Sequence, residues 1–451
     1  MARTVKKKKE LTNEEKLAEA LVPVEEQPYP VPENWLWTKI DCINQYRSAS
    51  FDPSKQSETL FELYSVPSSA DNYPEIISGK DIGSTKQEVQ KGDVLLCKIN
   101  PRINRVWKVF QHTQWTLLAS SEWIIIRNCM INSDYLMHCF RSPYFRDYML
   151  SNVSGVGGSL MRAQPKYVKN YPIPLPPLPE QQRIVDRIES LFAKLDEAKE
   201  KTQAVVDGFE DRKAAILHKA FTGELTTEWR KNRNIALDSW LTQSLKESCS
   251  IGSGGTPSRK IPEYYRGQIP WIKTGEINWN EIYDSEEHIS QNAVDNSSAK
   301  IYPADAVLVA MYGMGVTRGR AAILKVKATT NQAVCVLQPK EYLLNRFLYY
   351  YFMCNYWDVR EQAVGGNQLN LSGAIIAKFI ISIPSIDEQN EITKTLDSLF
   401  EKEQQAKDAA EQVISQIDTM KKSILARAFR GEMGTNDPAE ESAVEMLKRI
   451  L

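Results

Sequence analysis

The sequence predicts an α+β protein in which two mixed α/β domains are separated by two long helices. These helices are expected to pair as an antiparallel coiled coil, within a pseudo-two-fold internal repeat. Two observations lead to this prediction. Residues 180–225 and 388–433 align with each other without a gap, so that Glu180 corresponds to Glu388, and such a long self-match indicates an internal duplication. Each copy also follows a domain-sized segment in which short β-type runs alternate with turn residues.

Apolar residues in both copies recur at alternating steps of three and four once polar Thr202 and Arg212 are counted in phase, with Glu403 as the one charged interruption of the second copy. This is the heptad pattern of a coiled coil. The predicted interface consists of Ile184, Ile188, Leu191, Leu195, Val205, Phe209 and Ile216 in the first copy and Ile392, Leu396, Leu399, Val413, Ile417 and Ile424 in the second. About 40 residues at ~1.5 Å each make a helix on the order of 60 Å long. One such stripe alone would equally fit a helix lying on a globular core, but two copies in one register favour pairing with each other.

Capping residues mark the ends of both predicted helices. Ser385 stands three residues before Glu388, the spacing at which a hydroxyl and a carboxylate each accept a hydrogen bond from the other residue's N–H. Pro179 suits the first turn of the other helix, where its missing N–H would have no partner. Gly223 and Gly431 supply the left-handed residue that closes a helix.

The chain has 451 residues, enough for two or three domains, and 56 lysines and arginines balance 57 aspartates and glutamates. This balance excludes binding of nucleic acid through global charge, so such a surface has to be a local patch. Scattered cysteines without a Cys-x-x-Cys pair indicate reduced thiols, and with dispersed histidines we expect no metal site. No signal-peptide pattern and no apolar run of about 20 residues is found, so we expect a cytoplasmic protein.

The repeat divides the chain into six predicted segments. They are an N-terminal tail with a short helix (1–34), a first domain (35–172), a first coil helix (173–229), a second domain (230–380), a second coil helix (381–433) and a C-terminal helix (434–451). Thr12 or Asn13 is the expected cap of the N-terminal helix and Asp437 that of the C-terminal helix, and the two helices are expected to dock on each other or on a partner. Aromatic residues at 135–150 and 343–359 predict a helix near the end of each domain, with its rings in the core.

Two basic segments occupy matching positions in the two domains. Residues 91–115 contain five lysines and arginines against one acid, residues 309–327 contain four and no acid, and each follows the same predicted strand. Lysine and arginine neutralise phosphates, while arginine, asparagine and glutamine also pair with base edges. A solvated face is the alternative for either segment alone, but the matching positions favour DNA contact.

The candidate DNA-binding residues extend from these segments to neighbouring turns. They are Lys80, Lys98, Asn100, Arg102, Arg105, Lys108 and Gln114 in the first domain and Thr256, Ser258, Arg259, Lys260, Lys273, Thr274, Tyr312, Thr317, Arg318, Arg320, Asn367 and Gln368 in the second. The glycine-rich run at 251–260 would suit wrapping of a phosphate by backbone amides, although a plain turn fits its spacing equally well. It lacks the Gly-Lys-Ser/Thr ending of a nucleotide-binding loop.

Several motifs carry a family resemblance that covers nearly the whole chain. Residues 174–185 (Pro-Leu-Pro-Pro-Leu-Pro-Glu-Gln-Gln-Arg-Ile-Val), their copy at 383–392 and the Ala-Phe-x-Gly-Glu helix ends resemble conserved regions of the DNA-specificity (S) subunit of type I restriction-modification systems. The runs at 254–258 (Gly-Gly-Thr-Pro-Ser), 269–275 (Ile-Pro-Trp-Ile-Lys-Thr-Gly) and 331–334 (Asn-Gln-Ala-Val) resemble its target-recognition domains. The first domain departs from the family by lacking the Gly-Gly-Thr-Pro-Ser run.

The resemblance implies two target-recognition domains, each reading one half of a split, asymmetric sequence in double-stranded DNA. It implies two methyltransferase (M) subunits as partners and motor-nuclease (R) subunits in the full complex. S-adenosylmethionine, ATP and Mg are then expected on the partners, and no catalytic residue, cofactor or metal on this chain. The coil would set the distance between the two domains, so that residues inserted into it lengthen the unread gap between the half-sites.

Two alternatives come from other classes of protein. A self-contained methyltransferase or nuclease would show a cofactor motif, and we find none in the sequence. A coiled-coil scaffold without base-specific DNA binding would explain the coil, but it would not explain two divergent basic domains.

Overall fold

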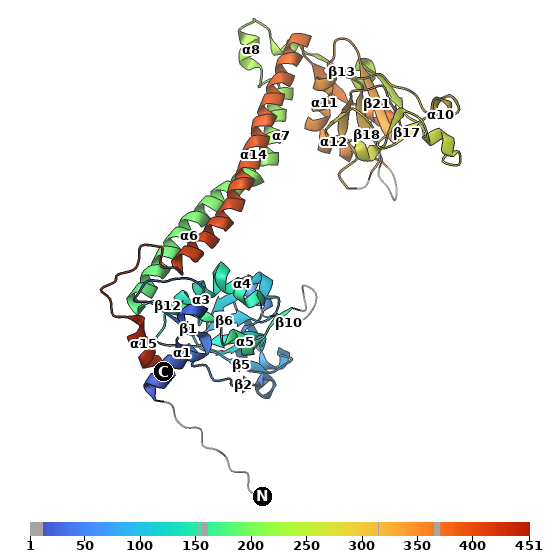
Figure 1. Ribbon diagram of the computed structural model, residues 1–451. Coiled ribbons are helices and arrows are strands. Elements are labelled where there is room, and N and C mark those ends of the chain that lie inside the picture. Colours follow the sequence, from blue (N-terminus) through green and yellow to red (C-terminus); the bar gives the residue numbers. More distant parts are fainter. Residues whose placement is uncertain (1–11, 152, 155–160, 314, 365–369) are drawn as a thin grey trace. The chain divides into compact units, whose positions relative to one another are not determined.

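The computed structural model describes residues 12–151, 153–154, 161–313, 315–364 and 370–451. The chain forms two compact units, unit 1 (Met1–Thr202 with Gln412–Leu451) and unit 2 (Gln203–Glu411). Each unit contains one mixed α/β domain and a stretch of paired coil helices (Figure 1). Across the described residues, no helix combines the length and the apolar character that crossing a membrane requires.

Unit 1 contains two main sheets and several short helices. Its strands are β1 (Leu36–Lys39), β2 (Ser50–Phe51), β3 (Leu60–Tyr64), β4 (Glu75–Ser78), β5 (Lys86–Glu88), β6 (Val94–Cys97), β7 (Val106–Lys108), β8 (Thr116–Ala119), β9 (Trp123–Ile126), β10 (Val153–Ser154), β11 (Arg162–Ala163) and β12 (Pro172–Leu175). Its helices outside the coil are α1 (Asn13–Ala20), α2 (Ile40–Ile43), α3 (Ser133–Arg141), α4 (Pro143–Ser151), α5 (Pro165–Val168) and α15 (Ala443–Ile450). The sheet orders are β7-β6-β9 and β2-β5-β8-β3-β4, and β1 pairs antiparallel with β12.

Unit 2 also contains a five-stranded and a three-stranded sheet, but its strands are distributed differently between them. Its strands are β13 (Leu241–Ser244), β14 (Cys249–Ser253), β15 (Ile269–Ile272), β16 (Glu281–Ile282), β17 (His288–Ile289), β18 (Val307–Ala310), β19 (Ala321–Leu324), β20 (Thr329–Thr330), β21 (Val334–Pro339) and β22 (Ile380–Ile383). Its helices outside the coil are α8 (Thr227–Lys231), α9 (Leu245–Ser248), α10 (Gln291–Asp295), α11 (Asn345–Cys354), α12 (Tyr356–Glu361) and α13 (Gly373–Ile376). The sheet orders are β14-β21-β18-β19-β16 and β17-β15-β20, and β13 pairs antiparallel with β22.

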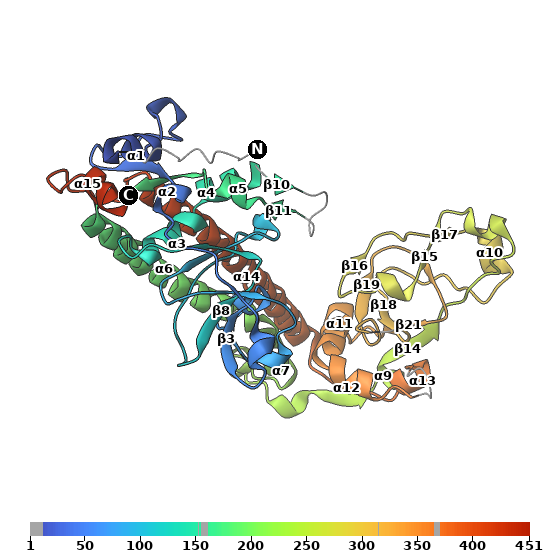
Figure 2. The same ribbon diagram turned by 90° about the horizontal axis from the view of Figure 1, so that it is seen from below.

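The central strands β6 and β18 are the equivalent elements of the two domains. Each lies between the following hairpin strand and a later strand, in the orders β7-β6-β9 and β19-β18-β21, and pairs antiparallel with both. Both strands are apolar at every position because successive side chains point to opposite faces and both faces are covered. Helix α11 covers one face of β18, β19 and β21 (Figure 2).

The coil is formed by α6 (Leu178–Asp207), α7 (Phe209–Phe221) and α14 (Ile386–Ala428). In unit 1, Asp196 contacts Lys421 and Lys199 contacts Asp418 at 3.0 Å, so α6 and α14 run in opposite directions. In unit 2, α7 lies along α14 (Figure 1), and Arg212 of α7 pairs with Glu403 at 2.7 Å. Glu403 is the charged residue in the apolar heptad stripe of α14, and Arg212 pairs with its charge. The predicted antiparallel pairing is confirmed within each unit.

Burial varies along the predicted coil interface. The buried members are Ile184, Ile188, Phe209, Ile392, Leu396 and Ile417. The half-buried members are Leu191, Leu195, Ile216, Leu399 and Ile424. Val205 and Val413 are 39% and 40% exposed, so the structure does not bury these two predicted positions. Ile184 and Ile188 also pack into the core of the first domain, so the start of α6 serves two interfaces.

The first coil segment is two helices, whereas the heptad pattern predicted one. Gly208 separates α6 from α7. Arg212 Nη2 donates to the Val205 carbonyl oxygen at 2.9 Å, and a Cβ on Gly208 would lie 2.7 Å from Arg212 Nη1. The glycine therefore leaves room for a guanidinium that takes a carbonyl released by the helix. The predicted left-handed helix ends are confirmed, with φ of 80° at Gly223 and 75° at Gly431.

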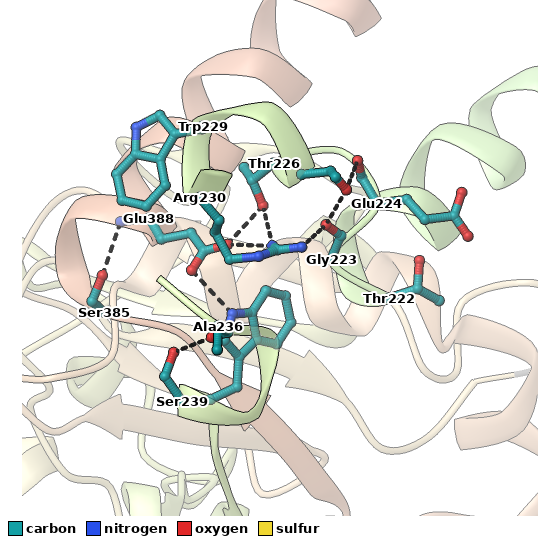
Figure 3. A network of polar contacts seen from close by, with 12 residues as sticks. Thr222, Gly223, Glu224, Thr226, Trp229, Arg230, Ala236, Ser239, Ser385 and Glu388 are labelled. Atoms are coloured by element: carbon teal, nitrogen blue, oxygen red, sulfur yellow. Dashed lines mark hydrogen bonds and ion pairs between the residues drawn. The ribbon is translucent and has the colours of Figure 1, made fainter. Parts of the chain in front are cut away.

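A buried carboxylate network lies where the coil begins in unit 2 (Figure 3). Glu388 Oε1 accepts from Arg230 Nη1 and Thr226 Oγ1, both at 2.7 Å, and Oε2 accepts from Trp240 Nε1 at 3.0 Å. Glu388 is 1% and Arg230 6% exposed. The expected cap is therefore only half right: Ser385 Oγ accepts from the Glu388 N–H at 3.3 Å, but the carboxylate serves the network instead.

The corresponding Glu180 in unit 1 has a network of its own. Its Oε2 accepts from Trp35 Nε1 at 2.7 Å and from Asn436 Nδ2 at 2.8 Å, and the residue is fully buried. These donors are neutral, whereas Glu388 has an arginine. Thr435 Oγ1 also donates to Glu180 Oε1 at 3.3 Å, as Thr226 does to Glu388. Both junctions thus share a buried carboxylate, an indole donor and a threonine hydroxyl, and they differ in the last donor, an arginine on Glu388 and an asparagine on Glu180.

The terminal helices dock on each other within unit 1. Side chains of α1 and α15 share one apolar core cluster, and Thr12 caps α1 as predicted. The predicted start of the C-terminal helix is wrong, because Ser442 caps α15. Asp437 lies in a turn instead, since Asn34 Nδ2 donates to its carbonyl at 3.0 Å and Arg183 holds Glu440 at 2.7 Å.

The two aromatic segments each form a pair of helices instead of the predicted single helix. The first breaks between α3 and α4, where Pro143 cannot continue a helix, and the second breaks at Asn355 between α11 and α12. Most of their rings lie in the core as predicted, and Tyr135, Phe140 and Phe347 are fully buried, but Trp357 of α12 is 67% exposed. The break gives each domain a short second helix beside its basic loop.

Candidate nucleic-acid interface

Both predicted basic segments form hairpin loops at the same place in their domains. Residues 98–105 connect β6 to β7 in unit 1, and residues 311–320 connect β18 to β19 in unit 2. Asn100 and Asn104 adopt left-handed φ values of 47° and 52°, and glycines take this role in unit 2. The prediction that the basic segments follow equivalent strands is therefore confirmed.

Arg102 is the exposed cation at the tip of the unit 1 loop, on the short 3₁₀ helix Pro101–Ile103. Two other predicted cations are already paired with acids. Lys108 forms an ion pair with Asp134 of α3, and the exposed Lys80 lies 3.3 Å from Glu58. Arg102 is thus better placed than Lys108 to meet a phosphate.

The remaining predicted residues of unit 1 differ in exposure. Lys98 and Arg105 are half-buried at the two ends of the loop, whereas Gln114 is exposed on the connection between β7 and β8. Asn100 Oδ1 is buried, and no hydrogen-bond partner for it is found among the described residues. The structure brings Lys98, Asn100, Arg102 and Arg105 together in one loop and places Gln114 in the next one.

Glu62 supports that second loop and was not singled out from the sequence. This fully buried residue of β3 accepts hydrogen bonds from the His112 N–H at 3.2 Å and from the Thr113 N–H at 2.8 Å. The Tyr64 hydroxyl also donates to it at 2.8 Å, and burial together with this bond raises the pKa of Tyr64. A lone acid in the apolar strand Leu60–Tyr64 was the available signal.

The glycine-rich run of unit 2 packs against the protein itself. The Gly255 N–H donates to the Thr330 carbonyl at 2.9 Å, so this amide is not free to bind a phosphate. A Cβ on Gly254 would lie 1.9 Å from the same carbonyl oxygen, and one on Gly255 would lie 2.3 Å from Ser298 Oγ. These two glycines are therefore explained by close packing, and the turn interpretation fits them better than the phosphate loop.

Acidic side chains surround the cations of this region. Glu287 pairs with Arg259 at 2.5 Å and with Lys273 at 3.0 Å, while Lys273 also lies 3.1 Å from Glu286. These pairs hold the pKa values of Arg259 and Lys273 above their usual range, and that of Glu287 below it. Thr256 bonds to Gln332. Ser258 and Lys260 are exposed, and Thr274 is half-buried.

The unit 2 loop presents the other predicted residues. Tyr312 is 42% exposed, Thr317 and Arg318 are half-buried, and Arg320 Nη1 donates to Asn278 Oδ1. Asn367 and Gln368 lie outside the described residues. Within the described residues, no group of histidine, cysteine or acidic side chains could hold a metal ion.

Comparison with known proteins agrees with this arrangement. The chain is 30% identical over 188 residues to the type I restriction enzyme MjaIX specificity subunit of Methanocaldococcus jannaschii, which is 40% of this chain and 42% of that subunit. It is 30% identical over 193 residues to the EcoR124I/EcoR124II specificity subunit of Escherichia coli, 40% of this chain and 48% of that one. The chain thus matches less than half of the length of these two relatives.

A solved structure shares the fold. The HsdS subunit from Thermoanaerobacter tengcongensis matches with a TM-score of 0.65 over 91% of this chain and 100% of that one, at 21% identity. A family profile described as the type I restriction modification DNA specificity domain matches residues 58–206 and 238–413, which together are more than half of the chain. Each match covers most of one domain and part of the coil helix that follows it. The chain therefore belongs to the family of type I restriction modification DNA specificity domains.

Proposed function

We propose that this chain is the DNA-specificity subunit of a type I restriction-modification complex, in which each domain reads one half of a split, asymmetric sequence in double-stranded DNA. The observation that carries the proposal is the pair of basic hairpin loops that leave equivalent strands, β6 and β18. Around these equivalent strands the loop sequences differ, Lys-Ile-Asn-Pro-Arg-Ile-Asn-Arg at 98–105 against Thr-Arg-Gly-Arg at 317–320. One scaffold with two different loops suits two different half-sites.

The coil would set the gap between the half-sites and dock the partners. We propose two methyltransferase subunits on this chain, joined by motor-nuclease subunits in the complete complex, within the cytoplasm. S-adenosylmethionine, ATP and Mg would be bound by those partners, and this chain would contribute no catalytic group. With a net charge of −1 the chain has no overall attraction for DNA, so partner subunits are expected to add phosphate contacts and raise the affinity.

The test is co-expression with the methyltransferase encoded beside this chain, followed by mass determination of the complex and sequencing of modified DNA. Two methyltransferases per copy of this chain and one split modified sequence are expected. The proposal fails if the chain stays alone and modification persists after its deletion. A complex that forms but methylates without base preference would support a coiled-coil scaffold instead.

A further inference from the structure

Helix α12 holds the main chain of the unit 2 loop. Arg360 Nη2 donates to the Gly315 carbonyl oxygen at 2.7 Å, and Nη1 donates to the Arg318 carbonyl oxygen at 2.6 Å. Tyr356, one turn earlier, donates its hydroxyl to the Val316 carbonyl oxygen at 2.5 Å. Two side chains of one short helix thus bind three carbonyls of the loop.

The loop needs such support because of its glycines. Gly315 and Gly319 have φ values of 65° and 88°, and a loop built on such residues has many conformations to lose. The stem of Arg360 packs against the loop so closely that a Cβ on Gly319 would lie 3.0 Å from Arg360 Cγ. Glycine at position 319 therefore leaves the room that the Arg360 stem occupies.

Aromatic rings fix the guanidinium in turn. Arg360 Cζ lies 5.2 Å from the ring centre of Tyr356 and 5.6 Å from that of Trp357. Arg360 Nη1 also donates to the Tyr356 hydroxyl oxygen at 3.1 Å, and the ring centres of Tyr356 and Trp279 lie 5.5 Å apart in a T-shaped arrangement. A planar fork with rings around it has little freedom left, so it can fix the carbonyls that it binds.

In unit 1, the short second helix α4 and the preceding helix α3 bind the basic loop in a related way. Arg146 of α4 donates Nε to the Arg102 carbonyl oxygen at 3.1 Å. Asn104 Nδ2 donates to the Phe140 carbonyl oxygen of α3 at 3.0 Å, which ties the other end of the loop to the preceding helix. In both units an arginine of the short second helix therefore binds the carbonyl of an arginine in the basic loop.

We propose that Arg360 is a positioning residue for the second half-site, which fixes the main chain of residues 315–320 so that the side chains of Thr317 and Arg318 meet base edges at set places. The proposal rests on the proposed function, since it concerns the DNA sequence that unit 2 reads. Arg146 has the same role for the first half-site. The base preference of the second half-site then depends on α12 as well as on the loop. Grafting the loop into another recognition domain without α12 should not transfer that preference.

The experiment uses the complex with methyltransferase subunits and a DNA library randomised in both half-sites. Four proteins are compared: the wild type, Arg360→Met, Arg360→Lys and the control Glu361→Gln, an exposed neighbour on the same helix. We expect Arg360→Met to lower the preference for the cognate base at least about tenfold at one or more positions of the second half-site. The first half-site should be unchanged. Arg360→Lys should behave similarly, because a lysine keeps the charge but not the fork.

Retention of the second half-site preference within twofold in both Arg360 variants would overturn the proposal. If Arg360→Met lost all methylation, Tyr356→Phe would decide, since it removes one loop hydrogen bond and keeps the ring; an unchanged second half-site would then count against the proposal. Arg146→Met should relax the first half-site alone, and relaxation of both half-sites would contradict the assignment. A wild-type complex without any split sequence would instead refute the proposed function itself.

Discussion

Removal of the Arg230 side chain should destabilise unit 2 and leave unit 1 unchanged. Glu388 is 1% exposed and accepts from Arg230, from the Thr226 hydroxyl at 2.7 Å and from the Trp240 indole at 3.0 Å. Arg230→Met removes the guanidinium donor and leaves the two neutral donors. A buried charge left without its counter-charge costs about 3–5 kcal/mol. The two remaining neutral donors place the expected loss near the lower end of that range.

A second substitution separates the charge effect from lost packing. Glu388→Gln alone should destabilise unit 2, because it leaves the cation of Arg230, 6% exposed, without its carboxylate. In the Arg230→Met background the same change should restore stability by at least about 2 kcal/mol, since it neutralises the stranded carboxylate. Lys231→Met is the matched control: this exposed lysine pairs with Glu228 at 2.7 Å, and its loss should cost at most about 1 kcal/mol.

Hydrogen exchange of the full chain, followed by mass spectrometry, measures the opening free energy of each unit separately. Peptides from β18 and β21 report on unit 2, and peptides from β6 and β9 serve as the internal reference in the same molecule. The reasoning is refuted if Arg230→Met costs less than about 1 kcal/mol, or if Glu388→Gln fails to rescue it.

Three further predictions concern other parts of the chain. Burial, with Arg141 adding to it, lowers the pKa of His138 to about 4. Because an unfolded histidine takes up its proton near pH ~6.5, the free energy of unfolding of unit 1 should be independent of this group above that pH and fall by about 3 kcal/mol towards pH 4. His138→Met should remove this loss in denaturant titrations, and an unchanged pH slope would contradict it. Gly255→Ala should lower the unfolding midpoint by the equivalent of about 1–3 kcal/mol, because the new Cβ would lie 2.3 Å from Ser298 Oγ. Gly275→Ala is the control, since open space surrounds that position, and equal midpoints in the two variants would refute the packing argument. In DNA binding by the assembled complex, Arg102→Ala should reduce the slope of log affinity against log salt by about 0.9, and Lys108→Met should leave it unchanged because Lys108 is already paired; equal effects would refute the assignment.

Local patterns in the sequence were sufficient for the duplication, the antiparallel coil and the two helix ends that are closed by glycine. The heptad spacing predicts which face of a helix is apolar, and the glycines at 223 and 431 close their helices because only a residue without a Cβ takes that φ cheaply. The matching positions of the basic segments also followed from the sequence, since each comes directly after a buried apolar strand. Which lysines and arginines are available for DNA was less predictable, because the sequence does not show which acidic residue each of them pairs with in the fold.

Patterns along the chain were thus enough to predict the repeat, the fold class and the place of both basic loops. Tertiary structure alone decided that Lys108, Arg259 and Lys273 are paired with acids, and that Glu388 binds an arginine 158 positions away instead of closing a capping box. It likewise decided that Arg360 faces the carbonyls of a loop 42 positions earlier. The physical reason is that periodicity and turn chemistry act between neighbours along the chain, whereas the partner of a charge is chosen by which distant segments pack beside it.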